Sequence, residues 1–212
     1  MMLDLFENYK ETVAIAPGAV LFKGFVENAR ALLGAIGDVT ARSPFRHMAT
    51  SGGYRMSVAM TGCGERGWVS DKRGYRYDPT DPETWCPWPE MPAAFLQLAK
   101  EAAAEAGYPE FSPDACLINR YDIGAKLSLH QDKDELDLTA PVVSVSLGLP
   151  ATFLFGGLSR NEPKKKLRLV HGDVVVWGGP SRLAYHGVSP LKPGLHPLLG
   201  NIRINLTFRK TE

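Results

Sequence analysis

Eight short apolar runs, from residue 114 onward, constrain the fold of this chain more than any other feature. Turn residues separate the runs, and no stretch between them has the apolar spacing of a helix. Strands that follow one another without helices pair antiparallel, which predicts two packed sheets in a sandwich or jelly roll. The runs are ACLINRYD, KLSLHQD, PVVSVSLGLP, ATFLFGG, KLRLV, GDVVVWGG, AYHGVSP and RINLTFR.

Helical spacing is confined to the first half of the chain. Residues 26–41 carry apolar side chains at helical intervals, and residues 17–25 just before them read as a short strand. Residues 91–111 predict a second helix, because their alanines favour helix, Pro92 suits a first turn and Gly107 suits a C-terminal cap. The expected fold class is therefore mostly β with flanking helices, around a double-stranded β-helix (jelly-roll) core.

Residues 43–90 differ in kind from the rest of the chain. They are rich in Gly, Pro and aromatic residues, and turns interrupt their short strands, as is typical of a surface lid. We expect one structural domain in three parts: an N-terminal strand and helix extension over residues 1–42, this lid, and the jelly-roll core over residues 91–212.

Composition narrows the classes of protein that the chain can belong to. The net charge of +1 provides no global field for nucleic acid, so such a partner must be inferred from local charge. Three cysteines without a CxxC pair argue against a disulfide framework and for a reducing compartment. No apolar run approaches a membrane span, and the opening MMLDLFENYKE lacks the apolar core of a signal peptide. We expect a cytoplasmic protein without membrane contact.

The run LSLHQDKDE holds a candidate metal site. On a strand, His130 and Asp132 point to the same face, where they serve either as a hydrogen-bonded pair or as two ligands of a metal ion. His186 lies 54 residues beyond Asp132, where it begins a turn after a predicted strand. It is available as a third ligand. Two histidines and a carboxylate in this order form the ligand set of non-haem Fe(II) oxygenases, although an HxD dipeptide alone is more often structural.

Two strands carry polar side chains that could face the same interior. RINLTFR alternates between a polar and an apolar face, and two arginines turned inward would need anions such as those of a dicarboxylate. LINRYD places Asn119 and Tyr121 on one face, where they can donate hydrogen bonds to carboxylate oxygens. Each strand taken alone could instead show its polar face to water. The polar positions of RINLTFR are Arg203, Asn205, Thr207 and Arg209.

The lid is locally basic. Residues 42–76 hold seven Lys or Arg and two acids, a local charge of +5. Tyr54, Trp68 and Tyr75 are interleaved with these charges, and basic residues with aromatic planes are typical of nucleic-acid surfaces. A second basic cluster in residues 160–168 has two interpretations, solvated surface charge or a flank of the same mouth, and most single charges of this kind are simply solvated.

These runs together resemble a known family. NRY…G…LSLHQDKDE, VSVSLGLPATFLFGG, HGDVVVWGGPSRLAYHGV and RINLTFR resemble, in order and spacing, the AlkB family of Fe(II)/2-oxoglutarate dioxygenases, nearest to its bacterial DNA/RNA repair demethylases. The resemblance is dense from about residue 114 to 209, resumes in SPFRHMATSGGYRMSVAMT and GW…GYRY, and is weak over roughly the first 40 residues. The first residues and ELDLT depart from the family pattern, and no site position does.

The resemblance implies oxidative demethylation of N-alkylated nucleobases of the 1-methyladenine and 3-methylcytosine type, with release of formaldehyde, in direct reversal of alkylation damage. Fe(II), 2-oxoglutarate and O2 would be required. The partners would be single-stranded DNA or RNA, and duplex DNA with the base flipped out, and the protein would be a monomer.

The family pattern also implies a role for each site position. The residues that would hold Fe(II) and act in catalysis are His130, Asp132 and His186. Those that would bind 2-oxoglutarate are Asn119, Tyr121, Arg203, Asn205 and Arg209, with Arg203 on the distal carboxylate. Those that would contact the damaged base are Met60, Trp68, Tyr75, Leu117, Asp134 and Arg160, with the base between Trp68 and His130.

Two other functions fit the sequence. A nucleic-acid or peptide binding module with a vestigial metal site would form no succinate from 2-oxoglutarate. An oxygenase of proteins or small molecules would lack the basic, aromatic lid.

Overall fold

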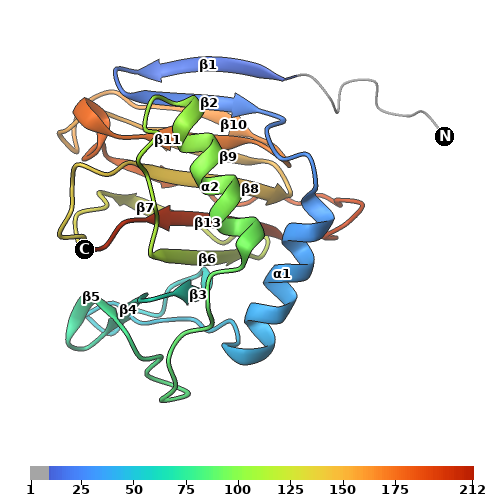
Figure 1. Cartoon of the computed structure of the whole chain (residues 1–212), viewed down its shortest axis with the longest axis vertical. Helices are drawn as coiled ribbons and strands as arrows, with labels where there is room; N and C mark the ends of the chain where they lie inside the picture. The colour runs from blue at the N-terminus through green and yellow to red at the C-terminus, as the bar shows by residue number, and fades with distance from the viewer. Residues whose placement is uncertain (1–9) are drawn as a thin grey trace.

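The structure, a computed structural model, describes residues 10–212, so nine residues of the opening segment MMLDLFENYKE lie outside the described part. A seven-stranded sheet, here the major sheet, runs in the order β1-β2-β11-β8-β13-β6-β3 (Figure 1). Its neighbouring strands are all antiparallel. Its strands are β1 (Glu11–Ala16), β2 (Ala19–Lys23), β3 (Ala59–Gly64), β6 (Ala115–Tyr121), β8 (Val142–Gly148), β11 (Val174–Trp177) and β13 (Arg203–Arg209).

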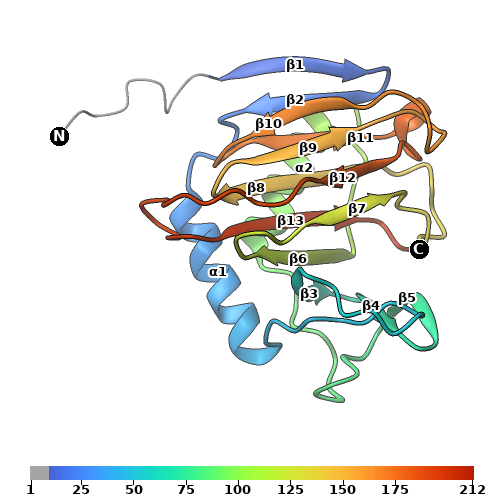
Figure 2. The same ribbon diagram turned by 180° about the vertical axis from the view of Figure 1, so that it is seen from behind.

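A second sheet packs on one face of the major sheet. This minor sheet has the order β10-β9-β12-β7 and is nearest the viewer in Figure 2. Its strands are β7 (Leu127–His130), β9 (Ala151–Phe155), β10 (Lys165–Leu169) and β12 (His186–Val188). A separate hairpin of β4 (Gly67–Asp71) and β5 (Gly74–Asp78) lies beside β3, at the edge of the major sheet (Figure 2).

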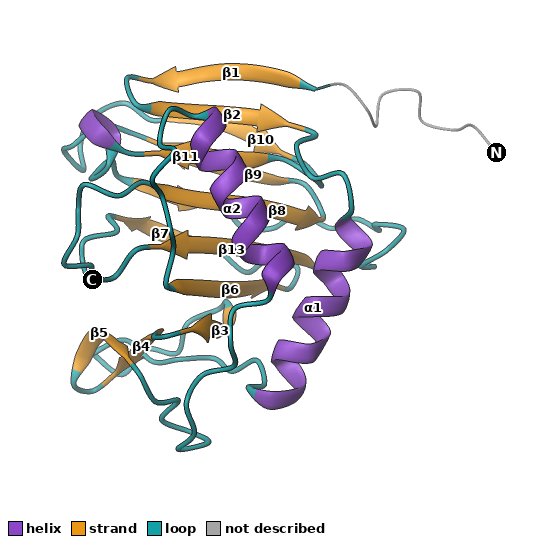
Figure 3. Cartoon of the chain, viewed as in Figure 1, coloured by secondary structure: helices purple, strands orange, loops and turns teal. Residues whose placement is uncertain are grey.

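Two helices cover the other face of the major sheet, as Figure 3 shows in purple. Helix α1 (Ala29–Arg42) begins at Asn28, whose side chain accepts a hydrogen bond from the Ala31 N–H, a common N-cap. Helix α2 (Ala93–Glu105) starts after Pro92 and is followed by Gly107 in the left-handed region, at φ +89°. Among the described residues, no helix has the length and apolarity to cross a membrane.

The two faces of the major sheet bury two separate cores. Ile204, Leu206 and Phe208 of β13 pack toward the helices, together with residues of α1 and α2. The core between the two sheets includes Trp177 and Phe153. Because β13 is buried on both faces, its alternate polar residues are enclosed in the sandwich rather than exposed to water.

The structure confirms the predicted fold class. All eight predicted strands are present as β6 to β13, and both predicted helices form, α2 being shorter than the predicted residues 91–111. Strand β1 was not predicted, because its run is short and begins with the polar residues Glu11 and Thr12. Strand β3 lies within the predicted lid segment but pairs with β6 in the major sheet. The three-part division of the chain stays a prediction.

Candidate functional site

The backbone register brings the two candidate histidines together. His186 begins β12 and lies opposite His130, the last residue of β7. Gly187 permits this pairing, because a Cβ on it would lie 2.8 Å from the Leu127 carbonyl oxygen of the neighbouring strand. His186 was predicted to begin a turn, and that prediction was wrong, since the residue is part of the sheet.

Asp132 completes a compact group with these histidines. It lies just beyond the end of β7 rather than on the strand as predicted. Its carboxylate oxygens are 3.6 Å from His130 Nε2 and 3.7 Å from His186 Nε2. The ligand atoms of the three residues all lie within 4.8 Å of one another, and within residues 10–212 no other such group could hold a metal ion.

Hydrogen bonds orient both imidazoles for metal binding. Nδ1 of His130 lies 2.8 Å from the Ser128 carbonyl oxygen, and Nδ1 of His186 lies 3.0 Å from that of Ala184. A carbonyl can only accept, so each Nδ1 carries the proton and each Nε2 presents its lone pair toward Asp132. This is the usual arrangement of histidines that bind metal through Nε2.

Burial and neighbouring charges set the protonation states of His186 and Asp132. Burial, followed by the influence of His130, lowers the pKa of His186 to about 4, so this imidazole is neutral near pH 7. Burial alone would raise the pKa of Asp132, but the Arg209 guanidinium and the two imidazoles outweigh it and hold that pKa below its ordinary value. The donor set is thus two imidazole nitrogens and one carboxylate, which suits Fe(II) with coordination positions left open.

Arg203 is a buried cation that forms no ion pair within the described residues. Its side chain is 1% exposed, and its Nη2 donates to the Ser146 hydroxyl at 2.9 Å. Within the described chain, its Nε and Nη1 have no hydrogen-bond partner. Burial lowers the pKa of Arg203 despite the opposing influence of Tyr121 and of the Asp173 carboxylate, and the Tyr121 ring centroid lies 6.0 Å from the guanidinium carbon. Orphaned guanidinium donors facing a cavity fit a carboxylate ligand.

Neutral polar groups form the wall between Arg203 and the triad. Asn119 donates to Asn205 Oδ1 at 3.2 Å, and Asn205 in turn donates to the Ser144 hydroxyl at 2.8 Å. Within the described residues, Asn119 Oδ1 accepts no hydrogen bond. Thr207 also donates to Asn205, so the predicted polar face of β13 is a connected network inside the sandwich.

Arg209 belongs to a buried ionic network that the sequence did not reveal. Its Nε and Nη2 donate to one oxygen of Asp132 at 3.0 and 2.9 Å, and its Nε lies 3.3 Å from Glu135. Glu135 also accepts hydrogen bonds from Tyr77 of β5 at 2.6 Å and from Arg182 at 3.1 Å. Burial raises the pKa of Tyr77 well above its ordinary value, so its hydroxyl stays a donor. Glu135 is the last residue of the run LSLHQDKDE. No sequence pattern distinguished this buried carboxylate from the solvent-exposed charges beside it.

One cavity of about 580 Å³ contains the whole predicted site. The residues that line it include all fourteen predicted positions, from Met60 and Leu117 to the triad and the arginines. At the mouth, the Trp68 ring stacks on Tyr75 with centroids 5.5 Å apart, and Trp68 Nε1 donates to Asp134 at 2.9 Å. The geometry therefore brings the predicted residues together, while their individual roles stay predictions.

The predicted basic lid is largely neutralised by acids. Asp71 pairs with both Arg73 and Arg76, and Asp78 also pairs with Arg76. Asp81 forms an ion pair with Arg46, whose side chain is 8% exposed. Arg66 pairs with Glu212. Most of the lid arginines thus hold the lid together, and the count of +5 overstated the charge that this segment offers to a partner.

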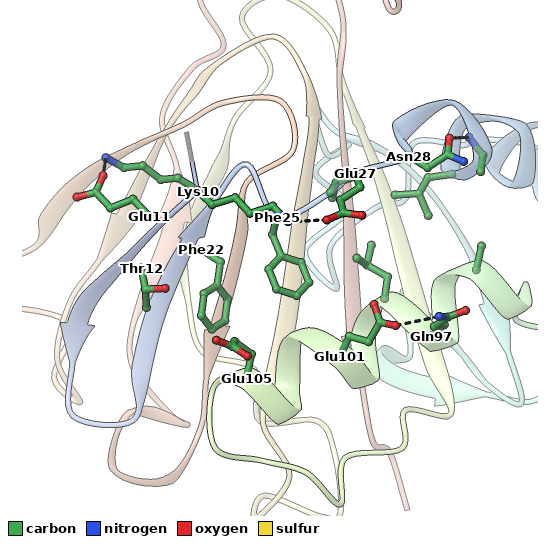
Figure 4. Close-up of a pocket in the computed structure, with 16 residues that line it drawn as sticks. Lys10, Glu11, Thr12, Phe22, Phe25, Glu27, Asn28, Gln97, Glu101 and Glu105 are labelled. Carbon is green, nitrogen blue, oxygen red and sulfur yellow. Dashed lines mark hydrogen bonds and ion pairs between the residues drawn. The ribbon is translucent and has the colours of Figure 1, made fainter. Parts of the chain in front are cut away.

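A second cavity of about 590 Å³ lies between β1, β2 and the two helices (Figure 4). Its lining charges are largely paired, since Lys10 binds Glu27 and Lys23 binds Glu11. None of the predicted site residues lines it.

Comparison with known proteins agrees with this geometry. The profile of the 2OG-Fe(II) oxygenase superfamily matches residues 18–209. The chain belongs to this superfamily. It is 62% identical to "Alpha-ketoglutarate-dependent dioxygenase AlkB" of Escherichia coli (strain K12), over 99% of this chain and 98% of that protein. It is therefore an AlkB-family dioxygenase, and the resemblance noted in the sequence is confirmed.

Two further relatives extend the AlkB comparison. "tRNA demethylase abh1" of Schizosaccharomyces pombe is 36% identical over 63% of this chain and 46% of its own length. The solved structure titled "The structure of OsALKBH1" is 32% identical, with a TM-score of 0.84 over 94% of this chain and 100% of that chain. Enzymes of this superfamily require Fe(II), 2-oxoglutarate and O2, and the triad and the unpaired Arg203 fit the first two.

Proposed function

We propose that this enzyme removes N-alkyl groups oxidatively from nucleobases in single-stranded DNA and RNA, as a direct reversal of alkylation damage. The observation that carries the proposal is one cavity that joins the metal-binding triad to an aromatic mouth. Trp68 and Tyr75 offer flat faces for a base, and AlkB-family relatives that act on nucleic acid support the substrate class.

Three groups of residues divide the work inside the cavity. His130, Asp132 and His186 would hold Fe(II), which, with 2-oxoglutarate and O2, supplies the oxidation of the N-alkyl carbon and the loss of formaldehyde. Arg203 would pair with the distal carboxylate of 2-oxoglutarate through its orphaned donors, next to Tyr121 and Asn205. Burial raises the pKa of Tyr121 to about 12, so its hydroxyl stays protonated and can donate to a carboxylate.

The other carboxylate of the co-substrate would lie nearer the triad. Asn119 and Arg209 line the cavity on that side, and we propose that they contact this group. Arg209 already holds Asp132 through Nε and Nη2, which fixes the carboxylate that would bind the metal.

Asp134 and Trp68 would select the base. A 1-methyladenine or 3-methylcytosine base is cationic, so a carboxylate at the mouth attracts it and discriminates against the neutral, repaired base. We propose that the base enters between Trp68 and His130 and that its exocyclic amine replaces the Trp68 N–H as the donor to Asp134. Met60, Leu117 and Arg160 would complete the walls and mouth.

The base must leave any stack to reach this depth. Unstacking costs a few kcal/mol in a duplex and less in a single strand, so single strands would be the easier substrates and duplex DNA would require base flipping. A monomeric state and a cytoplasmic location stay predictions.

The test is mass spectrometry of a 1-methyladenine oligonucleotide after incubation with enzyme, Fe(II) and 2-oxoglutarate. We expect the oligonucleotide to lose the mass of one methylene and 2-oxoglutarate to become succinate. His130→Ala should abolish both changes. Binding of the oligonucleotide without succinate would identify a binding module instead, and succinate formation stimulated only by proteins or small molecules would identify another oxygenase.

A further inference from the structure

In the part of the chain that the structure describes, no helix covers the outer face of the minor sheet. Both α1 and α2 lie on the far side of the major sheet, so β10, β9, β12 and β7 form an open surface toward the viewer in Figure 2. The four strands contain no acidic residue, and β10 alone carries Lys165, Lys166 and Arg168.

Strand register places two of these cations on the outer face. Leu167 pairs with Phe153, and both side chains pack in the core between the sheets. Since side chains alternate along a strand, the exposed Lys166 and Arg168 point the opposite way. Their partners on β9 are Leu154 and Thr152, so this part of the face combines cations with a hydroxyl and a small apolar surface.

Lys166 and Arg168 have no neutralising partner among the described residues. Within residues 10–212, neither Lys166 nor Arg168 forms an ion pair or a side-chain hydrogen bond. The neighbouring Lys164 and Lys165 donate to backbone carbonyl oxygens of Arg160 and Ile15, which satisfies their hydrogen bonds without cancelling their charge. The lid arginines, in contrast, are mostly paired with aspartates.

The basic face is continuous with the mouth of the active cavity. Arg160, in the connection between β9 and β10, lines the cavity and donates to the Leu129 carbonyl oxygen of β7 at 2.9 Å. Strand β7 also carries His130. From β7 to β10 there are three inter-strand spacings of about 4.8 Å, roughly 14 Å in all. One nucleic-acid strand, at about 3.4 Å per nucleotide in a helix, crosses this width in about four nucleotides.

We propose that the outer face of the minor sheet, through Lys166 and Arg168, binds backbone phosphates of the nucleic acid whose alkylated base occupies the cavity. The inference rests on the proposed function and adds a second contact region to it. It makes affinity depend on the length of the substrate, because only a chain that extends past Arg160 reaches β10.

The test compares Lys166→Ala/Arg168→Ala with the native enzyme on two substrates, a 1-methyladenine trinucleotide and an oligonucleotide of about 15 nucleotides, near the upper site size of single-strand binders. We expect a raised KM for the longer substrate, an unchanged kcat, and no change in either constant for the trinucleotide. The matched control is Arg30→Ala/Lys100→Ala, which removes the same charge from exposed positions of α1 and α2 on the opposite side.

A binding experiment separates specific phosphate contacts from a general loss of charge. Fluorescence anisotropy with an unmodified oligonucleotide needs no turnover, and each lost phosphate contact reduces the salt slope by about 0.7 for a single strand. Two lost contacts reduce it by about 1.4, so the affinity defect of the variant should be about sevenfold larger near 50 mM than near 200 mM salt.

The outcomes distinguish the two proposals. If neither substrate is demethylated by the native enzyme, the proposed function fails and the inference fails with it. If both are demethylated, and the β10 variant matches the native enzyme and the helix-side control on both substrates and in salt slope, only the inference is overturned.

Discussion

Replacing Arg203 by Met should stabilise the ligand-free protein and abolish its response to 2-oxoglutarate. In the native protein two buried donors of Arg203 lack partners among the described residues, and each such donor costs about 1–3 kcal/mol. Met has a similar length and no donors. Arg203→Met therefore removes the cost of the two unsatisfied donors, and it also removes one hydrogen bond to Ser146, worth about 1.5–3 kcal/mol.

The free energy of unfolding of the variant should therefore exceed that of the native protein by about 2 kcal/mol. For a chain of this size, such a difference raises Tm by about 4–8 °C. Binding of 2-oxoglutarate works in the opposite direction. At a concentration about 100 times its Kd, a ligand stabilises the folded state by about 2.7 kcal/mol. The native protein should gain that increment and Arg203→Met should gain none, so the order of the two melting temperatures should reverse.

The assay is thermal denaturation of both proteins with Mn(II), which prevents turnover, with and without 2-oxoglutarate. Arg30→Met is the matched control, because Arg30 is exposed on α1 and its loss should change neither Tm nor the response. A lower Tm for ligand-free Arg203→Met would show that the guanidinium is not a cost to the folded state. An undiminished gain with 2-oxoglutarate would show that Arg203 does not bind it.

Three further predictions concern the network, the mouth and a distant histidine. Tyr77→Phe removes a hydrogen bond to the buried Glu135 carboxylate and should lower the free energy of unfolding by about 1.5–3 kcal/mol in urea titrations. Asp134→Ala should reduce kcat/KM on cationic lesions more than on neutral ones, and equal losses would exclude charge recognition. Burial and then His196 lower the pKa of His171 below its ordinary 6.5, so the fold favours the neutral imidazole, whose Nδ1 accepts from the Gly148 N–H. The stability from this preference is present above pH 6.5 and is lost as the pH falls through 6.5 toward the lower folded pKa. His171→Asn, which keeps an acceptor, should flatten that decline in denaturation curves measured from about pH 8 to about pH 5.

The sequence predicted the sandwich because most of its strands are either alternating or continuously apolar. RINLTFR alternates strictly, and both of its faces proved to be buried, one against the helices and one in the cavity. Strand β1 escaped prediction because its residues are half exposed and gain their order from pairing with β2, a long-range effect that no local pattern contains.

The grouping of the three candidate ligands was predictable, whereas the charges that surround it were not. The chemistry of the group depends on the types and the order of His130, Asp132 and His186, and both can be read directly from the sequence. The pairing of Arg209 with Asp132 joins residues that are 77 positions apart, and the pairing of Arg46 with Asp81 is equally non-local. The count of lid charges therefore overstated the positive charge available to a partner, because a count does not show which cation is already paired with an acid.

Two arginines on one strand illustrate why that distinction matters for function. Arg209 is held by Asp132 and Glu135, and the opposite charge of Asp132 raises the pKa of Arg209 against the effect of burial. Arg203, six residues earlier and also buried, forms no ion pair within residues 10–212, and its hydrogen-bond partner there is the Ser146 hydroxyl. A permanent ion pair fixes the orientation of the Asp132 carboxylate, and it spares both partners the cost of an unpaired buried charge. An unpaired cation instead leaves its stabilisation to a ligand that comes and goes, which suits a co-substrate consumed in every turnover.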